Sequence, residues 1–266
     1  MNIFKPLGYK LIIMSGGNVN ESRRNFLKAM VTIAGLSIVA GALRGLEVLM
    51  PPEVSISGFP RLLLVDENGN PIKASSIPIN GKQIALFPYP LSNEPNMLLA
   101  LGDSSGSPVE VPPTTVVVPQ TGASYEFPGG VGPNKNIVAY SALCQHLGCT
   151  FPELTFYPPG VKAITVNGPM DKVIHCSCHG STFDPYKGGA VVTGPTVRPL
   201  PAVVLEWDSN TDELYAVKMI GPVIYGHPGF NTPTNNTINN PTGDLTGGSP
   251  ISGTSTVVKY YSNPAS

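Results

Sequence analysis

All four cysteines of this 266-residue chain lie in two short boxes, and three of its four histidines lie in or beside them. The first box, residues 144–149, reads Cys-Gln-His-Leu-Gly-Cys, and the second, residues 176–181, reads Cys-Ser-Cys-His-Gly-Ser. Thiolates and imidazoles are the side chains that bind soft and borderline metals. Their concentration in two boxes therefore indicates a metal or redox site.

The composition outside the boxes predicts an all-β fold. The chain has 29 glycines and 29 prolines, a share that argues against a helix bundle and favours short strands joined by turns. Hydrophobic residues still make up 41%, enough to fill a core. Short apolar runs between turn signals predict strands at 61–65, 83–87, 97–101, 115–118 and 136–143, and a hairpin of 202–207 with 213–219. We therefore expect an antiparallel all-β domain.

The N-terminal charges predict an export signal. Residues 1–50 carry six basic and two acidic side chains, whereas the rest carries ten basic and fifteen acidic ones. Without a basic patch beyond the N-terminus, we expect no nucleic-acid partner. Residues 22–28, Ser-Arg-Arg-Asn-Phe-Leu-Lys, match the twin-arginine export signal, and an uncharged run follows to residue 43.

We expect the apolar run to stay as a membrane anchor. Cleavage at Ala40-Gly41-Ala42 is the alternative, but Lys28 and Arg44 can snorkel and lengthen the usable span. The prediction is a cytoplasmic segment at 1–25 and one transmembrane helix at 26–43. Because basic residues precede the helix, the N-terminus stays in the cytoplasm and the body faces outward as the head of a single-pass membrane protein.

The exported body divides by composition. Residues 44–58 are predicted to form a flexible neck, since Pro51-Pro52 prevents the helix from continuing. Residues 59–225 hold the apolar runs and the boxes and are predicted to form the head domain. Gly, Pro, Asn, Thr and Ser make up most of 226–258, which predicts an irregular polar tail over 226–266. Docking of 257–261 as an edge strand is the less favoured alternative.

Four interpretations of the boxes compete. A structural zinc site usually uses closely spaced ligand pairs and no spare cysteines. Two disulfides would suit an exported protein but give the histidines no role, and a catalytic cysteine would need only one thiol. The remaining interpretation rests on the pattern Cys-x-His with a further cysteine, followed by Cys-x-Cys-His-Gly-Ser. This pattern resembles the Rieske iron-sulfur proteins, specifically the branch with an extra cysteine in each box.

The resemblance implies a [2Fe-2S] cluster and a ligand set. By motif position, Cys144 and Cys176 would bind one iron, and His146 and His179 the other. The disulfide of that branch would join Cys149 to Cys178. The implied fold is a Rieske-type antiparallel β-sandwich with an inserted cluster-binding subdomain at about 140–201, preceded here by the transmembrane helix.

Further positions match the family pattern. Gly148 and Gly180 suit the tight turns needed where backbone approaches a cluster. Ser181 matches the serine that hydrogen-bonds a bridging sulfide. Pro195 lies in residues 194–201, Gly-Pro-Thr-Val-Arg-Pro-Leu-Pro, which resemble the proline loop covering the cluster. Where respiratory members usually carry a tyrosine, this chain has Phe183, which removes a hydrogen-bond donor and predicts a lower reduction potential.

The resemblance also implies a function. The chain would be the electron-transfer subunit of a membrane quinol-oxidising complex, with His179 the first choice and His146 the second for accepting the quinol proton. Its partners would be quinol, a cytochrome b-type subunit, and a cytochrome or blue-copper acceptor. The alternative is the small subunit of an arsenite oxidase-type molybdoenzyme. Oxygenase ferredoxins lack the two extra cysteines, and an exported binding module would lack iron.

Overall fold

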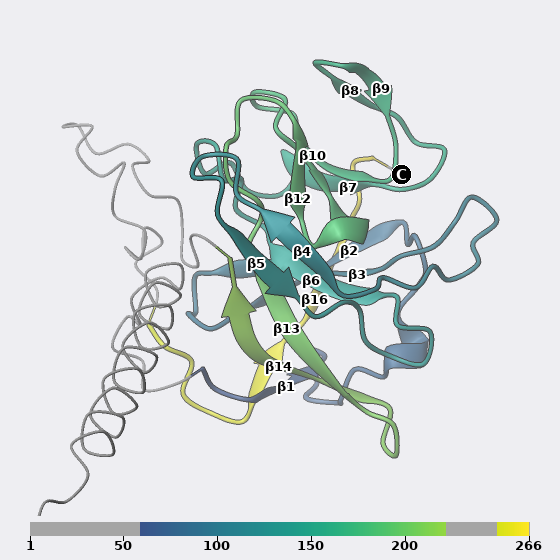
Figure 1. The fold of residues 1–266 in the computed structure, drawn as a ribbon. Coiled ribbons are helices and arrows are strands. Elements are labelled where there is room, and N and C mark those ends of the chain that lie inside the picture. Colours follow the sequence, from purple (N-terminus) through teal and green to yellow (C-terminus); the bar gives the residue numbers. More distant parts are fainter. Residues whose placement is uncertain (1–58, 222–248, 266) are drawn as a thin grey trace, which may run out of the picture. The chain divides into compact units, whose positions relative to one another are not determined.

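The computed structural model describes residues 59–221 and 249–265, and this part of the chain is almost entirely β-structure (Figure 1). The largest sheet has eight strands. In spatial order these are β15 (Ser255–Val257), β1 (Leu62–Val65), β14 (Glu213–Ile220), β13 (Ala202–Asp208), β6 (Ile137–Ser141), β3 (Pro95–Ala100), β2 (Gln83–Pro88) and β16 (Lys259–Ser262). Neighbouring strands are antiparallel except for β1 and β15, which are parallel.

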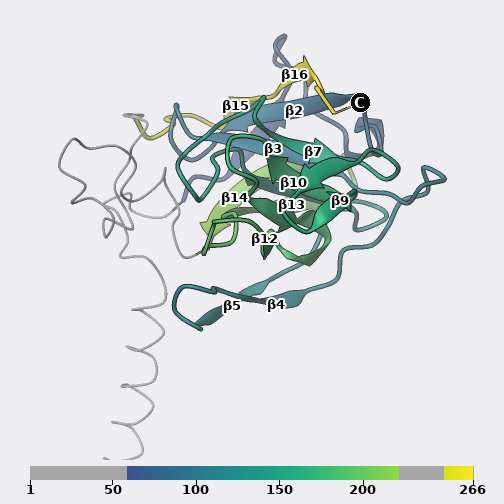
Figure 2. The same cartoon turned by 90° about the horizontal axis from the view of Figure 1, so that it is seen from above.

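A second, four-stranded sheet and two hairpins complete the described part (Figure 2). The second sheet consists of β12 (Ala190–Thr193), β11 (Thr182–Asp184), β10 (Val173–Cys176) and β7 (Leu154–Tyr157). The hairpins are β4 (Thr114–Val117) with β5 (Ser124–Phe127), and β8 (Ala163–Thr165) with β9 (Gly168–Met170). Two short 3-10 helices, η1 (Ala74–Ser76) and η2 (Pro185–Lys187), lie in connections.

The central strands bury both faces, which explains why their sequences are continuously apolar. On β3, Leu98 and Ala100 enter one hydrophobic core while Met97 and Leu99 enter a second. The first core is formed mainly by side chains from strands of the large sheet. The second lies between the large sheet and the four-stranded sheet, where it includes the cysteines Cys144 and Cys176. The cluster-binding loops are therefore packed onto the same core that joins the two sheets.

The C-terminal segment joins the two ends of the large sheet. Residues 255–257 pair with β1, and residues 259–262 pair with β2 at the other end of the strand order. Between them the Val258 amide donates to the Val65 carbonyl at 2.7 Å, and the Val258 side chain is buried in the first core. The irregular tail predicted for 226–266 is thus wrong over these strands. The less favoured alternative, docking as an edge strand, is found there, because Thr256 and Val258 are buried and the backbone pairs with β1 and β2.

The same segment is also attached to the four-stranded sheet. Asn263 is 4% exposed; its Nδ2 donates to the Phe156 carbonyl at 2.9 Å, and its Oδ1 accepts from the Thr155 hydroxyl at 3.0 Å. Both partners lie on β7. Residues 249–265 therefore stabilise the large sheet and the sheet that presents the second cysteine box.

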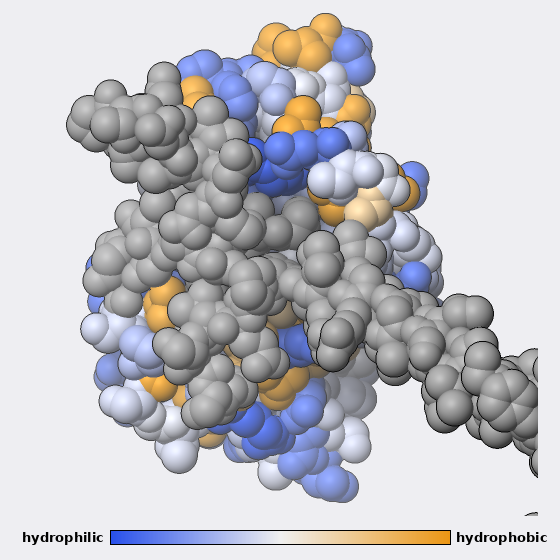
Figure 3. Space-filling model, turned by 60° about the vertical axis from the view of Figure 1, so that its left-hand side comes forward, coloured by the Kyte–Doolittle hydropathy of each residue, from blue (hydrophilic) through white to orange (hydrophobic). Residues whose placement is uncertain are grey.

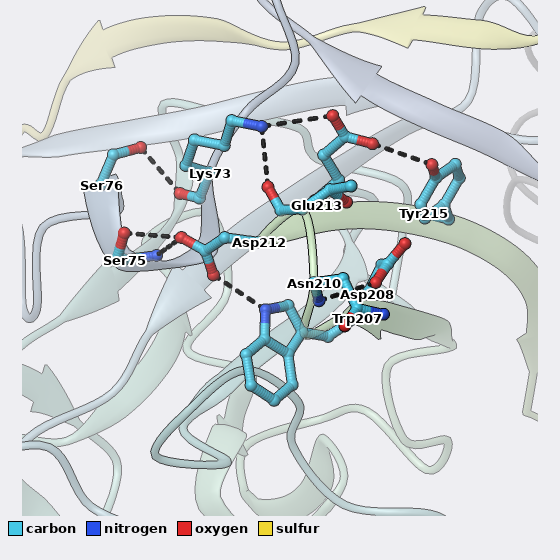
Figure 4. A network of polar contacts seen from close by, with 10 residues as sticks. Lys73, Ser75, Ser76, Trp207, Asp208, Asn210, Asp212, Glu213 and Tyr215 are labelled. Carbon is cyan, nitrogen blue, oxygen red and sulfur yellow. Dashed lines mark hydrogen bonds and ion pairs between the residues drawn. The ribbon is translucent and has the colours of Figure 1, made fainter.

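A polar network fixes the connection before β2 to the hairpin of β13 and β14 (Figure 4). Asp212 accepts hydrogen bonds from Ser75 and from the indole of Trp207, the single tryptophan of the chain. Lys73 Nζ contacts Glu213 at 3.2 Å, and Glu213 also accepts from the Tyr215 hydroxyl. Because this network fixes Trp207 on β13, the fluorescence of Trp207 can report on unfolding of the large sheet.

The structure confirms the all-β class and places strands at each predicted run, including the hairpin of 202–207 and 213–219. The strands of the cluster-binding region, 154–193, were not predicted individually. The predicted signal, anchor and neck at 1–58 lie outside the described residues. Within 59–221 and 249–265, no helix is long and apolar enough to cross a membrane.

Candidate metal centre

The first cysteine box forms a tight loop directly after β6. The Cys144 amide donates to the Cys149 carbonyl at 2.8 Å, and the Gly148 amide donates back to the Cys144 carbonyl at 2.9 Å. Gly148 has a φ of 79°, a conformation that residues with a side chain rarely adopt. The turn predicted from this glycine is therefore present.

The second box repeats this geometry between β10 and β11. The Cys176 amide donates to the Ser181 carbonyl at 2.9 Å, and the Gly180 amide donates to the Cys176 carbonyl at 2.9 Å. Gly180 has a φ of 87°. The two six-residue loops thus close by the same pair of backbone hydrogen bonds, with a cysteine in first position and a glycine in fifth.

A disulfide joins the loops. Cys149, the last residue of the first loop, is bonded to Cys178, the third residue of the second, as the resemblance implied. Cys144 and Cys176 remain free thiols, and both are 1% exposed. Cys149, Cys176 and Cys178 bring their sulfurs within 4.8 Å of one another, but only the sulfur of Cys176 is outside the disulfide and available as a thiolate.

The two free thiols contact each other. The Cys144 thiol donates to the Cys176 sulfur, which also accepts from the backbone amides of Cys178 and His179; together these lower the pKa of Cys176 to about 7 despite its burial. That donated hydrogen bond, with burial, raises the pKa of Cys144. Two sulfurs at contact distance, one of them readily deprotonated, form a donor pair suited to a soft cation.

The imidazoles lie at the outer side of the thiols. His146 and His179 have ring centroids 5.0 Å apart with their planes at 80°. His179 is exposed and His146 is half-buried. Burial, followed by the neighbouring His179, lowers the pKa of His146 and favours the neutral form that binds metals.

Two buried atoms at this site have no hydrogen-bond partner among the described residues: Nδ1 of His146 and Oγ of Ser181. Ser181 is 0% exposed and lies beside the Cys144 thiol. Buried polar atoms in proteins are normally satisfied, so such a pair indicates a missing partner. An unpartnered ring nitrogen, an unpartnered hydroxyl and two thiols fit an iron-sulfur cluster, whose iron and sulfide would satisfy them.

The proline loop packs directly on the second box. Gly194 has a φ of 95°, and a Cβ there would overlap the Gly180 carbonyl oxygen and lie 2.6 Å from the Ser181 Cα. Only glycine fits this position without displacing the second loop. Pro195 follows with its side chain exposed, and its role in covering the cluster stays a prediction.

Sequence reasoning missed the support behind the second loop. His175 is buried, with Nδ1 2.9 Å from the Thr182 hydroxyl, which donates to the Gly180 carbonyl at 3.1 Å. His175 lies on β10, directly before the second box, and is not one of the positions of the motif. Phe183 is fully buried in the core that includes both free thiols.

The disulfide gives a first prediction. Replacing Cys149 and Cys178 together by serine is expected to lower the free energy of unfolding by about 3–4 kcal/mol, because the bond closes a loop of 29 residues. Urea unfolding followed by Trp207 fluorescence measures this difference. The matched control is wild-type protein treated with a reductant, which should show the same loss; a stability equal to that of the oxidised protein would contradict the prediction.

Comparison with known proteins agrees with this geometry. The family model for the Rieske [2Fe-2S] domain matches residues 102–204. The chain is 31% identical to iodate reductase subunit IdrB of Denitromonas iodatirespirans over 77% of this chain and 84% of that protein. It is 27% identical to a putative respiratory nitrate reductase Rieske subunit of Haloferax mediterranei over 79% and 84% of the respective chains.

A third relative is the cytochrome b6-f complex iron-sulfur subunit 2 of Trichormus variabilis, 27% identical over 70% of this chain and 80% of that protein. These relatives are subunits of different redox complexes, and the family is what they share. Two matched loops, their disulfide and the family model agree: the chain belongs to the Rieske family and is an electron-transfer protein that binds a [2Fe-2S] cluster.

Proposed function

We propose that this protein is the Rieske electron-transfer subunit of a membrane quinol-oxidising respiratory complex. The observation that carries the proposal is the arrangement of the site: two buried thiols lie behind two imidazoles, of which His179 is exposed to solvent. An electron donor can therefore contact an imidazole edge while the thiols stay shielded from solvent.

The ligand set we propose follows from the same arrangement. Cys144 and Cys176 would hold one iron, and His146 and His179 would hold the other. Nδ1 of His146, which has no hydrogen-bond partner among the described residues, would be the ring nitrogen available to the iron. When bound, the cluster supplies a one-electron acceptor whose potential is raised by imidazole ligation. Ser181 would hydrogen-bond the cluster, Gly194 allows the proline loop to pack on the second box, and the disulfide holds the two loops together.

The surface beside His179 suits an apolar partner. Figure 3 shows hydrophobic residues gathered at the top of the molecule, where Figure 1 places β8 and β9. On this hairpin Ile164 and Val166 are 77% and 66% exposed, and Val166 Cγ1 lies 3.5 Å from the position of a Cβ on Gly180. Exposed apolar side chains next to an exposed ligand favour a quinol site in a membrane subunit of the cytochrome b type over a charged soluble donor.

The proposed location is the extracytoplasmic face of the cell membrane. The twin-arginine match, the apolar run at 26–43 and the neck at 44–58 support it from the sequence. The disulfide supports it from the structure, because such bonds persist in oxidising compartments. With His179 meeting the quinol and taking its proton, the head would then pass its electron to a cytochrome or blue-copper protein.

A second candidate is the Rieske subunit of an oxoanion oxidoreductase of the arsenite oxidase type. The similarity to an iodate reductase subunit and to a putative nitrate reductase subunit favours it. In an arsenite oxidase the exposed imidazoles would face a molybdenum-containing subunit, and that subunit, not quinol, would supply the electron.

The two candidates are separated by the donor that reduces the cluster. Membranes containing the full chain are oxidised, mixed with a short-chain quinol or with arsenite, and freeze-quenched for electron paramagnetic resonance. We expect quinol to reduce the cluster, and Val166→Asp to slow this reduction at least about tenfold by placing a charge in the apolar contact. Val117→Asp, an exposed valine on β4, is the matched control. Reduction by arsenite alone would contradict the proposal and support the second candidate.

The residue at position 183 gives a second prediction. Phe183→Tyr is expected to raise the midpoint potential, because a hydroxyl donating to a ligand thiolate withdraws electron density from the cluster. A redox titration followed by circular dichroism measures it. Phe59→Tyr, a ring stacked on Tyr89 in the other core, is the control. An unchanged potential in Phe183→Tyr would show that the missing hydroxyl has no electronic role.

A further inference from the structure

Arg198, in the proline loop, is a buried cation without a balancing charge. It is 7% exposed, and its Nε donates to Gln120 Oε1 at 2.8 Å. Its Nη1 is buried and has no hydrogen-bond partner in the described part of the chain. None of the ion pairs formed there involves it. An arginine side chain stays protonated in proteins, so the charge is present even though burial lowers its pKa.

The charge lies in the loop that packs on the second box. Gly194, four residues before Arg198, packs against Gly180 and Ser181 of the second box. A backbone of four residues spans at most about 14 Å. The Gln120 amide donates to the Val197 carbonyl at 3.0 Å, which fixes this end of the loop to the turn between β4 and β5. Arg198 thus belongs to the proline loop, whose other end, at Gly194, contacts the second box.

A cation in the proline loop interacts differently with the oxidised and the reduced cluster. Two ferric ions, two sulfides and two thiolates sum to zero net charge, and the added electron makes the reduced cluster singly negative. A buried positive charge therefore stabilises the reduced form and leaves the oxidised form nearly unaffected. Charges act over longer distances in a protein interior than in water, since the effective dielectric constant is about 20 instead of 80.

We propose that Arg198 raises the reduction potential of the [2Fe-2S] cluster through its buried, unpaired charge, and that Gln120 only positions its side chain. This role does not depend on quinol being the donor, since it concerns the potential of the protein itself. It also explains why a polar side chain at this position is buried among neighbours that give its Nη1 no acceptor.

The test compares charge with position. The full chain, loaded with its cluster, is titrated with dithionite as electron donor and followed by circular dichroism in Arg198→Met, Arg198→Gln, Arg198→Lys and Gln120→Ala. Removing the charge in the first two is expected to lower the equilibrium constant for electron acceptance about tenfold, which is about 59 mV for one electron. The last two keep the charge and should stay within about threefold of wild type.

Lys187→Met is the matched control, because this cation is exposed and pairs with Asp184, so solvent screens it. An unchanged potential in Arg198→Met would overturn the proposal, as would an equal fall in Gln120→Ala, which would assign the effect to loop position. If Arg198→Met does not retain its cluster, the difference between Arg198→Gln and Arg198→Lys decides. Electron paramagnetic resonance of each variant serves as a further control: g values equal to those of the wild type show that the cluster ligands are undisturbed.

Discussion

Substituting alanine for Cys176 is expected to abolish cluster binding, leaving less than about one tenth of the wild-type iron per chain. Cys176 is buried, its sulfur accepts two backbone hydrogen bonds, and its pKa is lowered to about 7, so it is the thiol best prepared to bind as a thiolate. No spare sulfur in the described residues can replace it, because Cys144 is itself a proposed ligand and Cys149 and Cys178 are bonded to each other. Iron and acid-labile sulfide analysis measures the loss.

The control for this variant is Ser177→Ala, the exposed neighbour in the same loop, which should keep the full iron content. Because loss of the cluster could also follow from misfolding, the disulfide should be tested in the Cys176→Ala protein as well. Its presence would show that the loops still meet. Full iron content together with a Rieske spectrum in Cys176→Ala would disprove the proposed ligand set.

The second large effect concerns the segment that joins the ends of the eight-stranded sheet. Val258→Asp is expected to lower the free energy of unfolding by about 4 kcal/mol or more, because Val258 is 1% exposed in the first core and a carboxylate there has no partner. Since domains are stable by about 5–15 kcal/mol, this removes much of the total. Urea unfolding followed by Trp207 fluorescence measures it.

The neighbouring residue supplies the matched control. Val257 is 38% exposed and points away from the core, so Val257→Asp should cost less than about 1 kcal/mol. The comparison tests the alternation of the strand as well as its burial. Equal stabilities of the two variants would mean that residues 255–262 do not form part of the folded sheet.

The cluster loops were predictable from sequence because their chemistry is local. A cysteine in first position and a glycine in fifth position fix each loop, and the glycine φ values of Gly148 and Gly180 follow from the turn. The strands at 97–101 and 136–143 were also readable, since residues buried on both faces give continuous apolar runs. In each case neighbouring residues in the sequence determine the structure.

What could not be predicted depends on contacts between distant residues. The strands β15 and β16 follow a polar stretch, and an edge strand at 257–261 was only the less favoured alternative, because pairing with β1 and β2 is not encoded in local composition. Similarly, Arg198 looks like an ordinary loop cation in the sequence, and only packing shows that it is buried. Gly194 belonged to a recognised motif, but its close approach to Ser181 required the fold.

The way in which residues 255–262 complete the sheet also bears on the order of folding. Val65 cannot gain its partner Val257 until nearly the whole described chain has been brought together, whereas β10 and β11 pair across a six-residue loop. Contacts between distant residues form slowly, because loop-closure entropy must be overcome first. The cysteine loops can therefore become ordered before β15 and β16 pair with the large sheet. During that interval the site is accessible for metal delivery.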